Sequence, residues 1–426
     1  MISRVRWSIF FLSVLSIFCL LYSYNDLIQT SIRTHDYRKR AGSLFTVTGS
    51  PSLDSPLVIV VCNPYENDTY KFGQQQSFSG NSTNPTNSSG GPIFENEETL
   101  AELRKSWTRQ SQQTLTMIKT LLYFSKSPLW RIIVISDSKR TFQRLANLTV
   151  AFPEVERRRL ILEHKYLWFP PEYPELRSHW RPCAWAKQFL AETLPKEDAV
   201  IYVDSDLLFL GPGEELWWLL KSMGPKQLIA LAPEPFYKLE EKTYHYAGRV
   251  GLNTGVMAIN LTRARQLPGG GMGSAILTEG PIQPEPRHDQ DALNHFLKDK
   301  PHLLMEVTSR WNFLPSSCMK TAPPCPDCYS AGIIVLHGAD MSFYRPVDVK
   351  FSVMYATLFG AAVDADPQLL YALLSAQLVL TDTIKLPYPC SNYSDINEAL
   401  TLRLAEEAAE SVRRKRAAYN FVSKIT

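Results

Sequence analysis

The sequence lacks the features of several classes of protein. Its 45 Lys and Arg nearly balance 42 Asp and Glu, for a net charge of only +3, and its basic runs are short, so we expect no nucleic-acid partner. With 45% hydrophobic and 20% charged residues, the bulk composition indicates neither disorder nor a fibre. No second C-x-x-C and no histidine pair at ligand spacing accompanies Cys325-Pro-Asp-Cys328 to complete a zinc site. We therefore expect a globular protein with one large or two smaller cores.

Long apolar runs are also scarce, with one exception near the start of the chain. Residues 7–24 carry no charge and follow Arg4 and Arg6, and this length can just span a bilayer. No small-residue cleavage site follows, so we favour an uncleaved signal anchor over a cleaved signal peptide, although the basic residues of 33–40 argue mildly against this orientation. The prediction is a single-pass type II protein of the Golgi or endoplasmic reticulum membrane. Its parts are a cytoplasmic tail (1–6), a transmembrane anchor (7–24), a stem (25–56) and a luminal remainder.

Glycosylation triplets and cysteines agree with a luminal placement. The N-x-S/T pattern occurs six times, and the cluster in a polar loop carries more weight than the total, since N-glycosylation takes place only on the secretory side. Outside the apolar run the cysteines number an even six, as expected of disulfides. Cys325 and Cys328 could form a zinc half-site or a redox pair, but we favour a structural disulfide that includes Cys318. The triplets are at Asn67, Asn81, Asn87, Asn147, Asn260 and Asn392.

Alternating apolar runs and helical patterns predict an α/β fold. Unbroken β-branched runs are typical of strands covered on both faces in a parallel sheet, and a helical pattern between two such runs forms a βαβ unit. We expect an α/β domain over residues 57–360, interrupted by a polar insertion at 70–92, and a helical extension over 361–426. Strands are predicted at 56–62, 130–137, 199–210, 226–232, 254–261 and 331–338, and helices at 97–124, 183–195, 356–380 and 397–421.

Two carboxylates interrupt the apolar run of residues 199–210. Asp204 and Asp206 are two residues apart, so on a strand they point to the same face and can share one cation. An unpaired carboxylate in a buried strand is costly, and hard cations such as Mg²⁺ or Mn²⁺ prefer carboxylate oxygens and substrate phosphates. In open α/β sheets, ligands bind beyond the carboxyl ends of the strands. The run therefore predicts a metal site that binds a diphosphate substrate.

Other candidate residues are weaker on spacing alone, because D-x-D is a common pattern. Asp289 and Asp291 precede an amphipathic helix, where N-terminal capping is the more frequent role. The pair at 364 and 366 has no strand before it and is assigned to a helix start or a loop. His337 ends a predicted strand, and Gly338 behind it allows close approach of backbone or ligand, so a third-ligand role competes with a structural one.

Five motifs in order resemble glycosyltransferase family 8, and within it the glucoside xylosyltransferases. They are "VDSDLLFL", "LNTGVMAINLTR", "HDQDALN", "WNF" and "LHG", and the likeness runs from about Leu57 to Phe359. Five ordered motifs are far more specific than any one of them. The resemblance implies a GT-A (Rossmann-like) fold. It also implies a retaining sugar transfer from a UDP-sugar, with Mn²⁺ (or Mg²⁺), to a glycosylated protein acceptor.

The likeness also implies roles for individual residues at the metal and the nucleotide. Asp204 would contact the ribose and the metal, Asp206 would hold the metal between the two phosphates, and His337 would be the third protein ligand. Lys187 stands where the family keeps a basic residue near the donor. Gly338 is expected beside the bound nucleotide.

At the sugar, the resemblance places two further groups and reverses the preference for capping. Asn253 and Gly255 would line the sugar pocket, while Asp289, Gln290 and Asp291 would face the donor sugar and the acceptor hydroxyl. These three are the predicted catalytic residues.

One position departs from the family pattern. Relatives have a lysine ahead of a proline after the histidine, where it touches the diphosphate, whereas this chain has Val347 near that place. We expect Arg345 or Lys350 to substitute. The leading hypothesis is transfer of xylose from UDP-xylose to a β-linked glucose on an EGF-like repeat. A galactosyl- or glucosyltransferase is the first alternative, because selection against one hydroxymethyl group is worth only ~1–3 kcal/mol. The altered lysine position motivates the second, a luminal sugar-nucleotide or glycan-binding protein without turnover.

Overall fold

The computed structural model describes the greater part of the chain after the predicted stem. The predicted tail, anchor and polar insertion lie outside the described residues, as do the stem up to residue 55 and the triplets at Asn67, Asn81, Asn87 and Asn392. Among the helices that are described, none has the length and hydropathy needed to cross a bilayer. The described residues are 56–62, 97–174, 176, 182–240, 246–279, 288–345, 348–383, 390 and 393–422.

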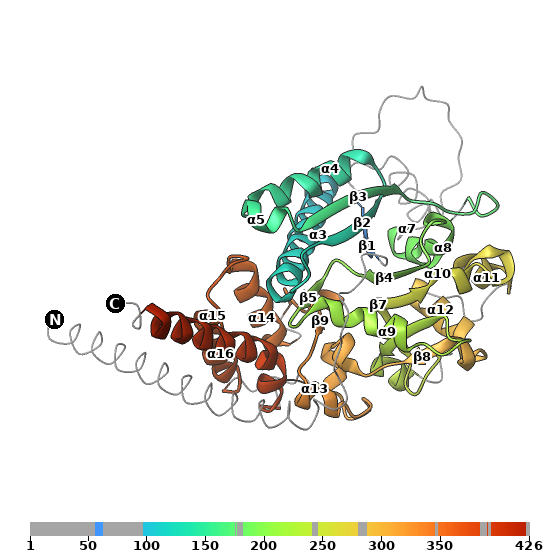
Figure 1. Ribbon diagram of the computed structural model, residues 1–426. Coiled ribbons are helices and arrows are strands. Elements are labelled where there is room, and N and C mark those ends of the chain that lie inside the picture. The colour runs from blue at the N-terminus through green and yellow to red at the C-terminus, as the bar shows by residue number, and fades with distance from the viewer. Residues whose placement is uncertain are drawn as a thin grey trace.

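A seven-stranded mixed sheet forms the centre of the protein (Figure 1). The α/β prediction is confirmed, but the sheet is parallel only in part: β7 runs antiparallel to both β4 and β6. An apolar run indicates that a strand is buried on both faces, but it does not indicate whether the strand runs parallel or antiparallel to its neighbours. In spatial order the strands are β3 (Leu160–Tyr166), β2 (Trp130–Ser136), β1 (Leu57–Val61), β4 (Ala199–Val203), β7 (Leu252–Asn260), β6 (Ile229–Pro233) and β8 (Leu304–Glu306).

The apolar run of residues 199–210, predicted as one strand, is two strands in different sheets. β4 ends at Val203, and after the two aspartates β5 (Leu207–Phe209) pairs antiparallel with β9 (Val335–His337) in a separate two-stranded sheet. The polar turn is where the chain leaves one sheet for the other. The aspartates therefore lie between strands and not within one.

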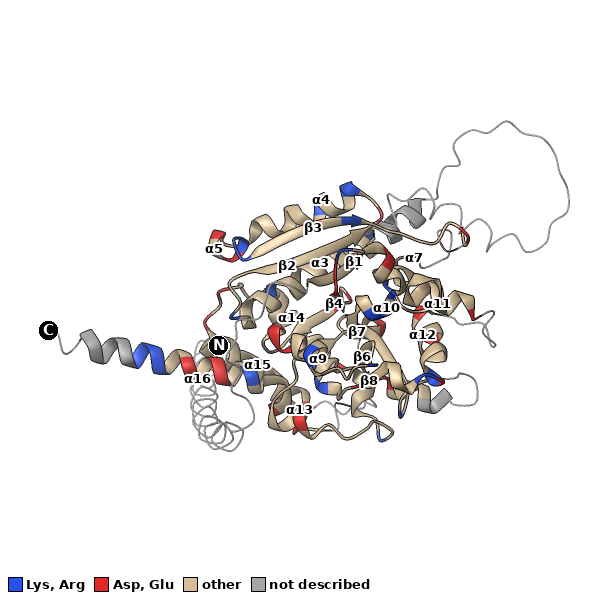
Figure 2. Cartoon of the chain, turned by 45° about the vertical axis from the view of Figure 1, so that its right-hand side comes forward, with Lys and Arg blue, Asp and Glu red and all other residues tan. Residues whose placement is uncertain are grey.

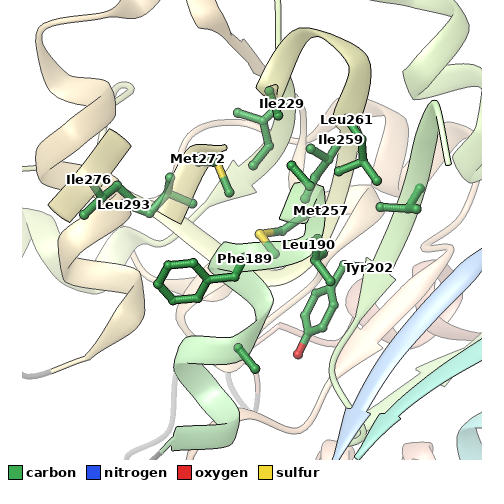
Figure 3. Close-up of a cluster of buried hydrophobic side chains, with 14 of the residues drawn as sticks. Phe189, Leu190, Tyr202, Ile229, Met257, Ile259, Leu261, Met272, Ile276 and Leu293 are labelled. Atoms are coloured by element: carbon green, nitrogen blue, oxygen red, sulfur yellow. The ribbon is translucent and has the colours of Figure 1, made fainter. Parts of the chain in front are cut away.

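Helices cover both faces of the central sheet (Figure 1). Side chains alternate along a strand, and in β1 Val58 and Val60 face one core while Ile59 and Val61 face the other. The first core packs against α7, α8 and α10–α12. Figure 3 shows part of this core, with Met257 of β7 and Phe189 among its side chains. The second core packs against α3 and α9. These helices are α3 (Glu97–Phe124), α7 (Pro182–Ala186), α8 (Leu190–Thr193), α9 (Leu216–Ser222), α10 (Leu261–Ala264), α11 (Met272–Thr278) and α12 (Asp289–Lys298), with α4 (Lys139–Leu148) and α5 (Glu154–Arg157) beside β3.

The C-terminal helices build a third core on the small sheet. Leu208 of β5 and Leu336 of β9 pack with apolar residues of α14 (Val349–Gly360), α15 (Pro367–Thr381) and α16 (Ile396–Val422). The helix predicted over 356–380 is interrupted before Asp366, whose side chain caps α15 by accepting from Gln368 N at 2.9 Å. Asp366 is thus at a helix start, one of the two roles that the sequence indicated for it. The basic run of residues 413–416 lies on exposed turns of α16 (Figure 2).

Three disulfides join the six cysteines outside the apolar run. Cys318 bonds to Cys390, Cys325 bonds to Cys328, and Cys62 at the end of β1 bonds to Cys183 of α7. The expected disulfide between Cys318 and a cysteine of Cys325-Pro-Asp-Cys328 is wrong, because Cys325 and Cys328 bond to each other and Cys318 bonds to Cys390. Disulfides are typical of domains that fold in the secretory pathway.

Candidate active site

A polar cavity of about 430 Å³ opens at one edge of the central sheet. The carboxyl ends of β1, β4 and β6 meet there, because β1 and β4 run in parallel and β7 returns between β4 and β6. Ligands of open α/β sheets bind at such an edge. Seven of the residues predicted for the site line the cavity: Lys187, Asp204, Asp206, Asn253, Asp289, Gln290 and His337.

Strand register brings His337 to the two aspartates. In the small sheet Leu207 pairs with His337, and Gly338 N donates to Asp206 O at 2.8 Å, so the histidine lies directly beside the acidic turn. His337 Nε2 lies 3.4 Å from Asp206 Oδ1 and 4.0 Å from Asp204 Oδ2. One ligand atom of each residue lies within 4.8 Å of those of the other two.

The donor set of these three side chains fits a divalent cation. Asp204 Oδ1 accepts from the Tyr202 hydroxyl at 2.5 Å, so its Oδ2 is the oxygen turned toward His337. His337 Nδ1 lies 3.0 Å from Asn312 Oδ1, and because that oxygen can only accept, Nδ1 carries the proton and Nε2 presents its lone pair. Two carboxylate oxygens and one imidazole nitrogen are ligands suited to Mn²⁺ or Mg²⁺.

Electrostatics point to the same demand for positive charge. Burial acts against ionisation of Asp206, but the charge of His337 outweighs it and holds the pKa of that carboxyl below its ordinary value. Burial lowers the pKa of His337, and the Asp206 carboxylate raises it by more, so that the pKa lies above the usual range. The two shifts show that negative charge at Asp206 favours a positive charge beside it, which a cation held between these groups would supply.

Lys187 connects the acidic turn to the start of α12. Its side chain is buried, and its ammonium lies 3.4 Å from Asp204 Oδ1 and 3.2 Å from Asp289 Oδ2. Burial lowers the pKa of Lys187, but the two carboxylates raise it above its ordinary value, so the ammonium stays charged. It is the one lysine among the described residues that line the cavity.

The three residues predicted at the start of α12 separate into two groups. Asp289 and Gln290 line the cavity, and Gln290 Oε1 accepts from Thr254 N at 2.9 Å, which fixes its amide against β7. Asp291 does not line it; its carboxylate accepts from His288 N at 3.0 Å and from the Tyr237 hydroxyl at 2.5 Å. Asp291 therefore caps the helix, which is the role its spacing favoured.

The two predicted glycines make room for neighbouring side chains. A Cβ on Gly255 would lie 2.2 Å from Cε1 of His337, and one on Gly338 would lie 2.3 Å from the ring of Phe343. Neither glycine is among the lining residues. Both are needed because side chains of the site and its support occupy the space where a Cβ would stand.

The candidates for a replaced diphosphate lysine lie away from the cavity. Lys350 is fully buried, and its ammonium donates to Asp382 at 2.5 Å and to Asn397 at 2.6 Å, which ties α14 to the C-terminal helices. Arg345 is exposed and is not among the lining residues. Arg109 of α3 is a cation that the sequence did not suggest: its guanidinium lies 3.6 Å from Met341 Sδ, in the loop after His337.

Two buried polar residues of the site were also missed. Glu234 follows β6 and lines the cavity, and Asn312 contacts His337. A carboxylate directly after the apolar run of residues 228–233 repeats the signal that singled out Asp204 and could have identified Glu234. Asn312 lies within the "WNF" motif, but nothing in its local sequence indicates which side chain it meets.

Comparison with known proteins gives a consistent result. Residues 112–337, more than half of the chain, match Glycosyl transferase family 8. Among relatives, glucoside xylosyltransferase 1 of Mus musculus is 29% identical over 278 residues, covering 60% of this chain and 66% of that protein. The protein of the same name from Danio rerio is 32% identical over 205 residues, covering 44% and 50%. The chain thus spans less than two thirds of the length of these relatives.

Two solved structures match the chain at low sequence identity. The apo form of mouse xyloside xylosyltransferase 1 covers 68% of this chain and 98% of its own, with 15% identity and a TM-score of 0.41. The galactosyltransferase LgtC, in complex with donor and acceptor sugar analogs, covers 72% and 95%, with 16% identity and a TM-score of 0.46.

Proposed function

Because the chain belongs to glycosyl transferase family 8, we propose that it is a metal-dependent transferase that moves a sugar from a UDP-sugar to a hydroxyl group of an acceptor. The observation that carries the proposal is the cluster of Asp204, Asp206 and His337 at the wall of the cavity. Three acceptor atoms this close repel one another unless a cation or a proton lies between them. We further propose that the domain has the GT-A fold and transfers with retention.

The proposed donor is UDP-xylose, and the proposed acceptor is a glucose on a glycoprotein such as an O-glucosylated EGF-like repeat. The names of the relatives, glucoside xylosyltransferases, support both assignments. The three disulfides support a catalytic domain in the lumen of the Golgi or endoplasmic reticulum. The uncharged run of residues 7–24 supports anchoring in the membrane with the N-terminus cytoplasmic.

Each group of residues has a distinct task in this mechanism. Asp204, Asp206 and His337 would hold the cation, which when bound supplies positive charge to the departing diphosphate. Lys187, charged and buried beside Asp204, orients that carboxylate and adds a second positive charge to the same wall. The rest of the anionic leaving group needs further donors, and Arg109 is a candidate because its guanidinium lies 3.6 Å from Sδ of Met341, the residue after Asp340 of the cavity lining.

Further residues of the cavity supply polar groups for the sugar. Asn253 and Thr254 of β7 and Gln290 of α12 are among its lining residues. The Thr254 contact holds the carbonyl oxygen of Gln290, so the amide is positioned before substrate arrives. Preorganised dipoles of this kind stabilise developing charge without having to reorient during the reaction.

A panel of donors tests the proposal. The full chain, purified in detergent and freed of metal, is incubated with UDP-xylose, UDP-glucose or UDP-galactose, with and without Mn²⁺ and an O-glucosylated EGF-like acceptor. We expect Mn²⁺-dependent transfer from UDP-xylose. Transfer from another donor would replace xylose in the proposal. Absence of transfer and hydrolysis with every donor, despite Mn²⁺-dependent UDP binding, would favour a binding protein without turnover.

A further inference from the structure

The buried carboxylate of Glu234 has no role in the mechanism above, although it lies at the wall of the cavity. It follows β6 and is 8% exposed. Its two oxygens accept from Ser316 Oγ at 2.8 Å, from Asn253 Nδ2 at 3.0 Å and from Phe236 N at 3.4 Å. Among the described residues these contacts are all donors, so both oxygens act as acceptors.

Two asparagine side chains continue from this carboxylate across the site. Because Asn253 donates its Nδ2 to Glu234, its Oδ1 points the other way, where it accepts from Asn312 Nδ2 at 2.7 Å and from Gly255 N at 2.8 Å. Asn312 therefore turns its own Oδ1 toward His337 Nδ1, at 3.0 Å. All of these side chains are buried, and each meets the next one directly at hydrogen-bond distance.

The direction of each bond follows from the one before it. An asparagine amide has a donor end and an acceptor end, and turning one amide round would place two donors or two acceptors face to face at the next contact. With Glu234 as a pure acceptor at one end, the only consistent order places an acceptor at His337 Nδ1. That order leaves the Nε2 lone pair facing Asp206.

We propose that Glu234 is a positioning residue that sets the tautomer of His337 through Asn253 and Asn312, and so prepares Nε2 to bind a divalent cation. The inference rests on the proposed metal site. The hydrogen bonds from Glu234 through Asn253 and Asn312 connect the main sheet, at β6 and β7, to the small sheet that carries His337. The partner of the free nitrogen of a metal-binding histidine fixes its tautomer and orientation, and loss of such a partner typically lowers metal affinity about 10–100-fold.

A different role for Glu234 makes a different prediction. Since Glu234 lines the cavity, its carboxylate could instead contact the donor sugar. In that case its removal would impair transfer but leave the affinity for metal unchanged. Mn²⁺ binding to the protein without nucleotide therefore separates the two roles, and it does not depend on activity.

The experiment measures Mn²⁺ binding to the metal-free full chain by electron paramagnetic resonance of the unbound ion. Glu234→Leu removes the acceptor and excludes water, and we expect it to weaken Mn²⁺ binding at least ~10-fold. Glu234→Gln can keep its carbonyl toward Asn253, and we expect it to stay within ~3-fold of wild type. Glu192→Leu is the matched control, because Glu192 is a largely buried glutamate that accepts from Ser274 Oγ at 2.9 Å and has no link to His337.

A second substitution tests whether Glu234 acts through the amides. Asn312→Asp presents an oxygen to His337 whichever way it turns, so its addition to Glu234→Leu should restore Mn²⁺ affinity to within ~3-fold of wild type. If Glu234→Leu fails to fold by circular dichroism, Asn253→Ala breaks the same series of bonds and takes its place, with the same expectations.

Two results would overturn the inference: wild-type Mn²⁺ affinity in the folded single variant, or a double variant as weak as the single one. Failure of wild type itself to bind Mn²⁺ would instead overturn the proposed metal site. The two failures are therefore distinguishable.

Discussion

Gly255→Ala adds one methyl group and should displace the metal-binding histidine. The new Cβ would lie 2.2 Å from Cε1 and 2.6 Å from Nδ1 of His337, and 3.0 Å from Asn253 Oδ1, whereas ordinary contacts begin near 3.4 Å. The backbone of Gly255 cannot easily retreat, because its carbonyl oxygen accepts from Asp204 N at 2.8 Å and its amide donates to Asn253 at the same distance. The imidazole must therefore shift by about 1 Å, a misplacement that can cost about 100-fold in rate.

The assay compares Gly255→Ala with Gly360→Ala at the end of α14, where an added Cβ meets nothing within 4 Å. We expect Gly255→Ala to lower single-turnover transfer by about 100-fold and Mn²⁺ affinity by at least ~10-fold, and the control to match wild type. Thermal unfolding checks that both variants are folded. Wild-type Mn²⁺ affinity in folded Gly255→Ala would refute the reasoning, since the ring would then not need the space that the glycine leaves.

Four further substitutions test the remaining assignments. Asp206→Ala should lower turnover at least ~100-fold and abolish the Mn²⁺ dependence of UDP binding; if both persist, the acidic pair is not the metal site. Gln290→Ala should slow single-turnover transfer at least ~10-fold while its UDP affinity stays within ~3-fold of wild type. If UDP affinity fell as much as the rate of transfer, the amide of Gln290 would contact the nucleotide instead. Lys187→Met leaves the buried carboxylate of Asp289 and the partly buried one of Asp204 without their cation and should lower the free energy of unfolding in urea by about 3 kcal/mol, so a change below about 1 kcal/mol would contradict the ion-pair geometry. Arg109→Ala should raise the KM for the UDP-sugar about 10-fold, as expected for loss of a charge-assisted hydrogen bond. Arg345→Ala is the control and should keep this KM within ~2-fold of wild type. A larger rise in KM for Arg345→Ala than for Arg109→Ala would assign the diphosphate contact to Arg345.

The sequence predicted best those strands that are buried along nearly their whole length. β1 and β2 are unbroken apolar segments, and both were located to within a residue or two. β3 was missed because its burial is irregular: it lies at the edge of the sheet and is partly exposed. β8, of three residues, is too short to give a pattern.

The placement of Lys350 shows why the replacement cation could not be identified from spacing. Near the end of the loop after His337, a lysine looks available to the diphosphate, yet the fold turns it inward to Asp382 and Asn397. Its partners come from segments that were predicted only as a helical extension. Whether a cation after His337 faces the cavity depends on how α14 packs against those helices, and local sequence does not encode that contact.

Some properties of this protein follow from local sequence, because burial and backbone period leave a pattern within each segment. The apolar runs required a covered α/β sheet, and the two charges within the run of residues 199–210 required a cation or another partner near Asp204 and Asp206. Contacts between distant segments decided the rest. The register of β5 on β9 brings His337 to the acidic turn, and the amides of Asn253 and Asn312 join it to Glu234. These partners lie far apart in the chain, so their pairing is set by the packing of two sheets and leaves no mark on any one stretch of sequence.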